Sequence, residues 1–407
     1  MNIRALTGFL DPGWPLDPRR IGALAVCMKT ARDALQGAGY PVQSLRLATP
    51  PPAEMDRPVP PNRRQELARQ LEAECFVHGI DYACLGPALA EEPQAYAVVP
   101  EVLAATESVF LSGMIADRES GLSLVAARGC AQAIAANSTI KADGFANLRF
   151  AALANVPPGA PFFPAGYHGG GGPAIAVAAE AAELAVDAMR EVTAPPTARR
   201  RLIGMIEAHA AALTRLIQTI ADENQVRFLG LDFSLAPYPD PLRSVGTALE
   251  AFGLPVVGQP GTLAAAAFLA DCLDRADFRR TGFNGLFLPV LEDPVLAARA
   301  ADGTLTLPYL LALSAVCGTG LDTVPLPGDV SPEALTGVLA DVGALALRLD
   351  KALTARLVPI PGRAAGDEVH FDSPYFADSR VMALPEQPLR GMLAEAGLLE
   401  LGPRLID

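Results

Sequence analysis

The amino-acid sequence predicts a mixed α/β protein in which helices cover one large, mainly parallel sheet. Short apolar runs typical of buried strands alternate with longer amphipathic segments along almost the whole chain. Apolar residues make up 51% and charged residues 19% of the 407 residues, so most of the chain is expected to fold around a core. We find no internal repeat and no segment with the character of a domain linker. We therefore expect one α/β domain over residues 1–407, and a closed α/β barrel is a fold that uses such a length in a single sheet.

The expected strands are apolar along their whole length, as strands buried on both faces usually are. In chain order they span residues 3–8, 44–49, 82–86, 148–155, 227–234, 286–290, 321–326 and 357–360. Two proline-rich stretches, 50–61 and 156–164, are expected to be loops.

The expected helices are amphipathic segments between these strands. In chain order they span residues 18–39, 61–79, 119–137, 173–191, 198–223, 241–253, 262–277, 306–316, 331–353 and 388–398. Several begin with a capping residue followed by proline, as at Asp240-Pro241, Asp293-Pro294 and Ser331-Pro332.

The composition excludes several classes of protein. The net charge of −13 and the lack of a large Lys/Arg cluster argue against a nucleic-acid surface. No uncharged apolar run reaches membrane-spanning length, and the first residues lack a basic-then-apolar leader. The six cysteines show no CxxC spacing, which disfavours a structural zinc site and fits buried thiols in a reducing compartment. We expect a cytoplasmic protein that binds neither nucleic acid nor membrane.

The first candidate site lies where an apolar run enters a proline-bracketed loop at residues 229–241. Asp232 and Ser234 are two residues apart on the expected strand, so their side chains should lie on the same face. The carboxylate and the hydroxyl could bind a cation, an amino group or a polar substrate. The alternative is that both satisfy backbone groups of the following turn.

A second candidate site lies in residues 305–329, which are expected to form a helix, a glycine-containing turn and a strand. Cys317 ends the helix, and Gly318 and Gly320 permit a tight reversal. The thiol could be a nucleophile, but no activating histidine is close in sequence, and a small buried thiol is the favoured interpretation. Asp322 is the stronger candidate, because a carboxylate on an apolar strand costs free energy unless it is paired.

A glycine-rich run, 169–172, precedes the expected helix 173–191. Unhindered backbone N–H groups at a helix start form a natural anion site, which makes Gly169, Gly170 and Gly171 candidate binding residues. His168 beside them could donate or accept a proton. The alternative is a flexible turn next to a packed histidine. The run is neither a P-loop nor a dinucleotide-binding fingerprint.

Two further candidates flank the expected strand 286–290. Glu292 follows the strand and is free to face a cavity, whereas the adjacent Asp293 is most simply a helix N-cap. Asn284 precedes the strand between two glycines, and it is either a ligand-binding amide or a turn residue. Serine-hydrolase elbows, zinc-protease motifs and glycosidase carboxylate pairs are absent from the sequence.

These motifs resemble the DUF711 family, also called UPF0210. The matching stretches, in family order and spacing, are 231–239, 261–267, 286–293 and 316–327, with a weaker match at 167–169. The resemblance covers most of the chain beyond about residue 95, and residues 1–95 are the more divergent part.

The family is similar in fold to pyruvate formate-lyase and other glycyl-radical enzymes, so the resemblance implies a single α/β barrel of about ten strands. It does not imply radical chemistry, because residues 393–407 contain no glycyl-radical segment. Neighbouring genes of family members often encode small ACT-type amino-acid-binding proteins, which implies a possible partner of this type and a role in amino-acid metabolism.

The residues and the resemblance together predict a non-radical enzyme that acts on a small anionic metabolite, of the amino-acid or 2-oxo-acid class, inside the barrel. Asp232 and Asp322 would be acid–base or cation-binding groups, and His168 with the glycine amides would hold an anionic group. If the carboxylates instead converge with Glu292, a Mg²⁺ or Ca²⁺ site is the better interpretation. The alternatives are a non-catalytic metabolite-binding or regulatory protein and a structural homo-oligomer.

Overall fold

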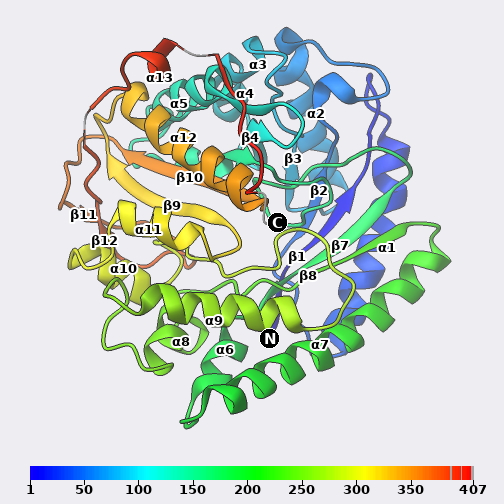
Figure 1. Ribbon diagram of the computed structural model, residues 1–407. Coiled ribbons are helices and arrows are strands. Elements are labelled where there is room, and N and C mark those ends of the chain that lie inside the picture. The colour runs from blue at the N-terminus through cyan, green and yellow to red at the C-terminus, as the bar shows by residue number, and fades with distance from the viewer. Residues whose placement is uncertain (386, 396, 405–407) are drawn as a thin grey trace.

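The computed structural model describes residues 1–385, 387–395 and 397–404 and has a mixed α/β fold (Figure 1). Its main sheet has eleven strands, of which nine form a continuous path. In spatial order these are β8 (Arg227–Asp232), β7 (Ala174–Glu180), β1 (Asn2–Phe9), β2 (Leu45–Ala48), β3 (Tyr82–Cys84), β4 (Val109–Asp117), β6 (Phe150–Ala154), β10 (Leu353–Ile360) and β9 (Gly320–Pro327). Strands β5 (Gly121–Ser123) and β13 (Leu398–Leu399) extend the sheet beside β4.

The path consists of two parallel sets of strands that run in opposite directions. Strands β1, β2, β3, β4 and β6 are mutually parallel. Strand β7 is antiparallel to β1 and parallel to β8, and β10 is antiparallel to β6 and parallel to β9. The amino ends of the first set therefore lie beside the carboxyl ends of the second.

Strands β8 and β9 are the two edges of this path, and the segment 286–290 lies between them. Single parallel bridges join Leu286 to Leu235 and Pro289 to Asp322. The segment is extended but is not a strand of the sheet. The prediction of an α/β protein with one large sheet is confirmed, whereas no closed barrel is found among the described residues.

Helices surround the sheet (Figure 1). Those that match predicted segments are α1 (Pro18–Gly37), α2 (Arg64–Val77), α5 (Leu124–Ser138), α7 (Pro195–Glu223), α8 (Val245–Ala251), α9 (Thr262–Arg275), α11 (Leu307–Ser314) and α12 (Pro332–Leu349). Helices α3 (Gln94–Ala97) and α4 (Val99–Ala105) were not predicted, and for α10 (Pro294–Ala301) only the start at Asp293-Pro294 was predicted. Asp293 caps α10, because its carboxylate accepts the N–H groups of Val295 and Leu296.

The predicted helix 173–191 is wrong over its first half. Residues Ala174–Glu180 form strand β7, and only Ala182–Met189 form a helix, α6. All seven residues of β7 are buried, and the strand pairs with β1 on one side and β8 on the other. The alanines have high helix propensity, but burial between two strands outweighs that preference.

The carboxyl-terminal part of the chain also differs from the sequence prediction. Of the helix expected over 388–398, the described residues form only the short α13 (Met392–Glu395), and residue 396 lies outside the described residues. Upstream of it, strands β11 (Glu368–Val369) and β12 (Ser379–Arg380) form a separate hairpin. The loop of this hairpin, residues 370–378, becomes important for the site.

The loop 156–166 packs against the face of the sheet opposite to the helices. On β1, alternate residues point to opposite faces. Gly8 closely approaches helix α1, whereas the hydroxyl of Thr7 donates a 2.8 Å hydrogen bond to the Pro161 carbonyl of the loop. Phe163 of the loop packs in the same cluster as Phe9. The loop therefore fills part of the space that the sheet encloses.

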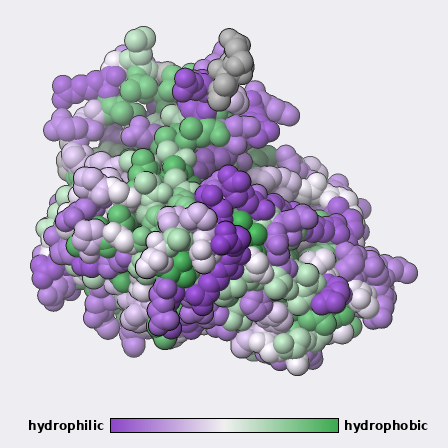
Figure 2. All heavy atoms as spheres, turned by 60° about the horizontal axis from the view of Figure 1, so that its bottom comes forward, coloured by the Kyte–Doolittle hydropathy of each residue, from purple (hydrophilic) through white to green (hydrophobic). Residues whose placement is uncertain are grey.

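No helix in the described part of the chain is both long and apolar enough to cross a lipid bilayer. Figure 2 shows hydrophilic side chains over most of one face, with smaller apolar areas between them. All six cysteines are buried and free, as the sequence predicted.

Candidate functional site

Two cavities lie at opposite ends of the strands. The first, which we name the arginine cavity, has a volume of about 260 Å³ and lies at the amino ends of β2, β3 and β4. Its charged wall consists of Arg4, Arg46, Arg149, Arg356, Asp81, Glu107, Glu292 and Asp322. Its aromatic wall consists of Tyr82, Phe110, Phe145, Phe162, Phe163, Phe287, Tyr375 and Phe376. The second cavity, of about 610 Å³, lies beside Asp117 at the carboxyl end of β4 and Lys351 before β10.

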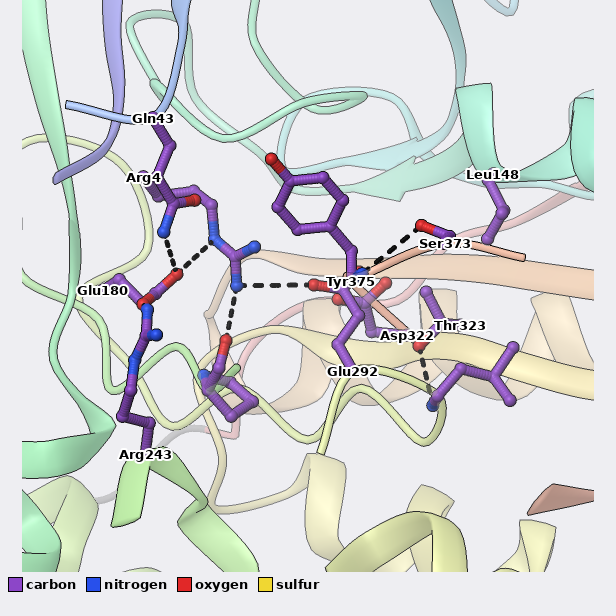
Figure 3. Close-up of polar contacts among 12 residues, drawn as sticks. Arg4, Gln43, Leu148, Glu180, Arg243, Glu292, Asp322, Thr323, Ser373 and Tyr375 are labelled. Atoms are coloured by element: carbon purple, nitrogen blue, oxygen red, sulfur yellow. Dashed lines mark hydrogen bonds and ion pairs between the residues drawn. The ribbon is translucent and has the colours of Figure 1, made fainter. Parts of the chain in front are cut away.

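A chain of alternating charges forms one side of the arginine cavity, and Figure 3 labels all of its members except Arg356. Its members, in order of contact, are Arg243, Glu180, Arg4, Glu292, Arg356 and Asp322. The Nε of Arg4 lies 3.3 Å from Glu180 and its Nη2 lies 3.5 Å from Glu292. Arg356 donates to Glu292 and to Asp322, each at 2.6 Å. The chain contains three arginines and three carboxylates, so its charges balance.

A β-bulge brings Asp322 to this network. The register between β9 and β10 shifts between Ala355 and Leu357, so Asp322 and Thr323 both lie opposite Arg356. Thr323 has a φ of 44°, a strained value for a β-branched residue, and its hydroxyl accepts the N–H of Leu291 at 3.2 Å. The bulge therefore holds a strained conformation directly beside the buried ion pair.

Burial and charge act in opposite directions on the two partners of this ion pair. Burial raises the pKa of Asp322 above its ordinary value, although Arg356 opposes the shift. Burial alone would lower the pKa of Arg356, but Asp322 and Glu292 hold it above its ordinary value. Arg356 therefore stays charged. Burial increases the proton affinity of Asp322.

Arg46 lies beside the network and is not neutralised by it. Its Nε donates to the Ser44 hydroxyl at 2.9 Å, and its guanidinium carbon lies 5.8 Å and 5.4 Å from the ring centres of Tyr82 and Phe163. It forms no ion pair with any residue that the structure describes. Burial, helped by the charge of Arg4, lowers the pKa of Arg46 to about 10. Arg46 is thus a desolvated guanidinium whose charge no carboxylate in the described part of the chain neutralises.

Asp232 and Ser234 do point the same way, but they do not line the arginine cavity. The fully buried Asp232 carboxylate accepts the Ser234 hydroxyl at 2.6 Å and the N–H groups of Phe283 and Asn284 at 2.7 Å and 3.0 Å. The Ser234 hydroxyl in turn accepts the N–H of Gly285. In the structure, the pair holds the loop that leads into segment 286–290, and it does not converge with Asp322.

The buried carboxylate of Asp232 gives a prediction on pH dependence. Burial raises its pKa from 3.8 to about 6, with the Ser234 hydroxyl acting against that rise. Because the folded pKa exceeds the unfolded pKa, this group stabilises the fold increasingly as the pH falls from 6 towards 3.8. We expect a ¹³C NMR titration of the Asp232 carboxyl to show a midpoint near 6, and Ser234→Ala to move it higher. A midpoint at the ordinary aspartate value, or no change in Ser234→Ala, would contradict this account.

The glycine run is not followed by the helix on which the anion-site prediction depended. It precedes strand β7, so no helix amino terminus is available there. The carbonyls of Gly170 and Gly172 instead accept hydrogen bonds from Arg227. Gly170, Gly171 and Gly172 line a hollow of about 380 Å³ whose charged neighbours are mainly acidic, and Gly169 packs on Pro158. Acidic neighbours disfavour an anion.

His168 lies beside this run but contacts neither cavity. Its side chain is 2% exposed, and its Nε2 lies 3.3 Å from the Gly171 carbonyl. Burial lowers its pKa, so the imidazole is expected to be neutral. The structure therefore separates His168 from Asp322.

Cys317 and Asn284 line the second cavity. Cys317 is 2% exposed, and its sulfur accepts the N–H of Gly320 at 3.4 Å, while Lys351 donates to the Cys317 carbonyl. Asn284 has a φ of 49°, and its side-chain oxygen accepts the N–H of Phe233 at 2.9 Å. The predicted site residues are therefore spread over several places, and of them only Asp322 and Glu292 line the arginine cavity.

The described residues contain no group of three histidine, cysteine, aspartate or glutamate side chains placed to hold a metal ion. The cation-site hypothesis required Asp232 and Asp322 to converge with Glu292. Only Asp322 and Glu292 come together, and the cation between them is the guanidinium of Arg356.

The sequence prediction missed the three arginines Arg4, Arg46 and Arg356. Each is a single charged residue in an otherwise apolar strand, on β1, β2 and β10. A buried charge is costly unless it is paired. This argument, which selected Asp322, applies equally to the arginines and could have identified them.

Comparison with known proteins places the chain in a family. The family model described as "Uncharacterised ACR (DUF711)" matches residues 16–376. A UPF0210 protein of Pyrobaculum islandicum is 36% identical over 346 residues, which cover 81% of this chain and 76% of that protein. UPF0210 proteins of Syntrophobacter fumaroxidans and Methanopyrus kandleri are 33% and 30% identical, and the alignments cover 82% and 90% of this chain and 77% and 88% of theirs. The chain belongs to the DUF711 family, whose curated members are named UPF0210 proteins.

Proposed function

We propose that the arginine cavity binds a small metabolite with one carboxylate group, of the amino-acid or 2-oxo-acid class, and that Arg46 is its counterion. The observation that carries this proposal is the unpaired guanidinium of Arg46 beside a charge chain that is already balanced. Arg149 also lacks a carboxylate partner among the described residues, but its terminal nitrogens donate to the carbonyls of Leu103 and Val109. In the part of the chain that the structure describes, the two terminal nitrogens of Arg46 have no such partners.

The chemistry of arginine supports a carboxylate as the ligand group. The two terminal N–H groups of a guanidinium match the two oxygens of a carboxylate, and a partly desolvated pair of this kind is stronger than one in water. The cavity volume of about 260 Å³ lies just below the range typical of drug-sized ligands, so it suits a small metabolite.

Asp322 gives the cavity a group that could exchange a proton with the ligand. Its raised pKa favours a carboxyl group that accepts and releases protons closer to neutrality, which is the property of a general acid–base catalyst. This supports an enzyme. The alternative is a non-catalytic metabolite-binding or regulatory protein, and it is supported by the bond that holds Asp322 to Arg356. The two can be distinguished with the variant Asp322→Asn. If the wild type turns over a bound ligand and Asp322→Asn still binds that ligand without turnover, the protein is an enzyme.

We further propose that the sheet and segment 286–290 together act as a barrel-like wall around the cavity, similar to the pyruvate formate-lyase fold without its radical chemistry. The support is the pair of parallel bridges from this segment to Leu235 and Asp322. A homo-oligomer and a small ACT-type partner remain predictions from the sequence.

The test of the binding proposal is the variant Arg46→Met, which retains a long apolar side chain between the two rings. We expect a panel of 2-oxo acids and amino acids to raise the melting temperature of the wild type. For the best ligand, we expect Arg46→Met to lower the affinity by about thirtyfold or more, because truncating one partner of a buried charge pair has at least that effect. Isothermal titration calorimetry measures the loss.

The control is Arg227→Met, which removes the same charge far from the cavity and should leave the affinity unchanged. Arg46 forms no ion pair, so Arg46→Met should unfold at the same temperature as the wild type or above it without ligand. Equal affinity in wild type and Arg46→Met, or no ligand from either class, would refute the proposal.

A further inference from the structure

Aromatic side chains are concentrated in the wall of the arginine cavity. Eight of its 22 lining residues are phenylalanine or tyrosine, although aromatic residues make up only 6% of the chain. The same cavity therefore combines the guanidinium of Arg46 with an aromatic wall.

The rings come from parts of the chain that are far apart in sequence. Tyr82 and Phe110 stand on neighbouring strands β3 and β4, with ring centres 5.5 Å apart. Phe163, from the loop that fills the enclosed space, continues this group at 5.6 Å from Phe110. Across the cavity, Phe162 of the same loop lies 4.6 Å from Phe287.

The hairpin loop 370–378 adds Tyr375 and Phe376 to the wall. Tyr375 is 39% exposed and packs edge-to-face on Tyr238, 6.0 Å away. Tyr82, Phe110 and Phe376 are also only partly buried. Rings whose only role is to form a core are normally buried completely, so these partly exposed rings are available to a ligand.

The need to surround Arg46 with rings does not explain the whole aromatic wall. The guanidinium lies over two rings, Tyr82 and Phe163. Phe162 and Phe287 face the cavity without contact to that cation, and Tyr375 belongs to a different element altogether. The number of rings exceeds what one guanidinium requires.

We infer that the ligand of the arginine cavity is a monocarboxylate with an aromatic body. Its carboxylate would pair with Arg46 and its ring would lie among Phe162, Phe287 and Tyr375. The inference rests on the proposed function and extends it from the anionic head of the ligand to the rest of the molecule. Among the described residues, Arg46 is the guanidinium of this wall whose two terminal nitrogens both lack a partner, so it matches one carboxylate, whereas those of Arg149 already donate to backbone carbonyls. A second carboxylate on the ligand would meet the acidic part of the wall, which includes Glu292 and Asp322.

The test compares phenylpyruvate with 2-oxohexanoate, which shares the same charged head but carries an aliphatic chain. Calorimetry should show phenylpyruvate binding to the wild type about five to ten times more tightly, because ring–ring contacts add to the burial of apolar surface. 2-Oxoglutarate should bind much more weakly because it carries two negative charges. 2-Phenylethanol should also bind much more weakly because it carries no charge. Phe287→Leu should reduce the preference for phenylpyruvate while retaining the affinity for 2-oxohexanoate.

The matched control is Phe268→Leu, which alters a stacked ring pair with Phe252 outside the cavity and should leave both affinities unchanged. If Phe287→Leu fails to fold, Tyr375→Ala on the exposed hairpin loop provides the same comparison. Arg46-dependent binding of both acids with equal affinity would overturn the aromatic inference and leave the proposed function standing. Binding of neither acid, or binding that Arg46→Met does not weaken, would overturn both.

Discussion

Replacing Arg356 by methionine is expected to lower the free energy of unfolding by about 3–5 kcal/mol, the loss typical of breaking a buried ion pair by removing one partner. Arg356 bonds Asp322 and Glu292 at 2.6 Å each, and its loss leaves two carboxylates close together in a buried site. Urea denaturation at neutral pH measures the change. Arg20, whose ion pairs are exposed, provides the control, and Arg20→Met should change the stability by less than about 1 kcal/mol.

The pH dependence of this loss tests its cause. The pKa of Asp322 is already raised by burial, and removing Arg356 removes a charge that holds it down. The destabilisation should therefore be full above the folded pKa of the carboxyl group and should shrink as the pH falls towards the unfolded value of 3.8. Adding Asp322→Asn and Glu292→Gln to Arg356→Met should recover part of the stability at neutral pH. A loss that is independent of pH, and is not reduced by these additions, would mean that packing rather than charge is responsible.

Sequence patterns correctly predicted the elements in which the local preference for helix or strand agrees with the pattern of buried residues. Helices α1, α7 and α12 have long amphipathic patterns and clear starts, and their bounds are close to the predicted ones. Strand β7 was missed because its alanines favour a helix in isolation, and only pairing with β1 and β8 makes it a strand. Strand β4 was missed because Ser112 and Gly113 interrupt an otherwise apolar run.

The candidate site was predicted only in part, for a topological reason. Asp322 and Glu292 were identified because each carries a charge at or near an apolar strand. Asp232 has the same local pattern, yet its carboxylate holds a loop and does not reach the cavity. Which of these groups meet depends on strand order and on the bulge at Thr323, and neither can be read from spacing along the chain.

Gly318→Ala is expected to lower the free energy of unfolding by about 3 kcal/mol or more, the upper part of the range for overpacking a core. A Cβ atom on Gly318 would lie 2.1 Å from the Cα of Gly285, and the reverse substitution meets the same contact. The Cα belongs to the backbone and the position of the Cβ is fixed by it, so no side-chain rotation relieves the clash. The turn before β9 and the segment that leads to 286–290 would have to move apart.

The control for this variant is Gly204→Ala, in the exposed interior of helix α7, where nothing lies within 4 Å of the added atom. Alanine is the better helix former, so this change should raise the stability by about 0.5–1 kcal/mol. The Gly285–Gly318 contact borders the second cavity, whereas Arg46 and Asp322 lie at the other end of the strands. Folded Gly318→Ala protein should therefore retain ligand affinity at the arginine cavity while losing stability. If both properties fall together, the two ends of the sheet are mechanically coupled; if neither changes, the close approach of the two glycines is not a constraint on the fold.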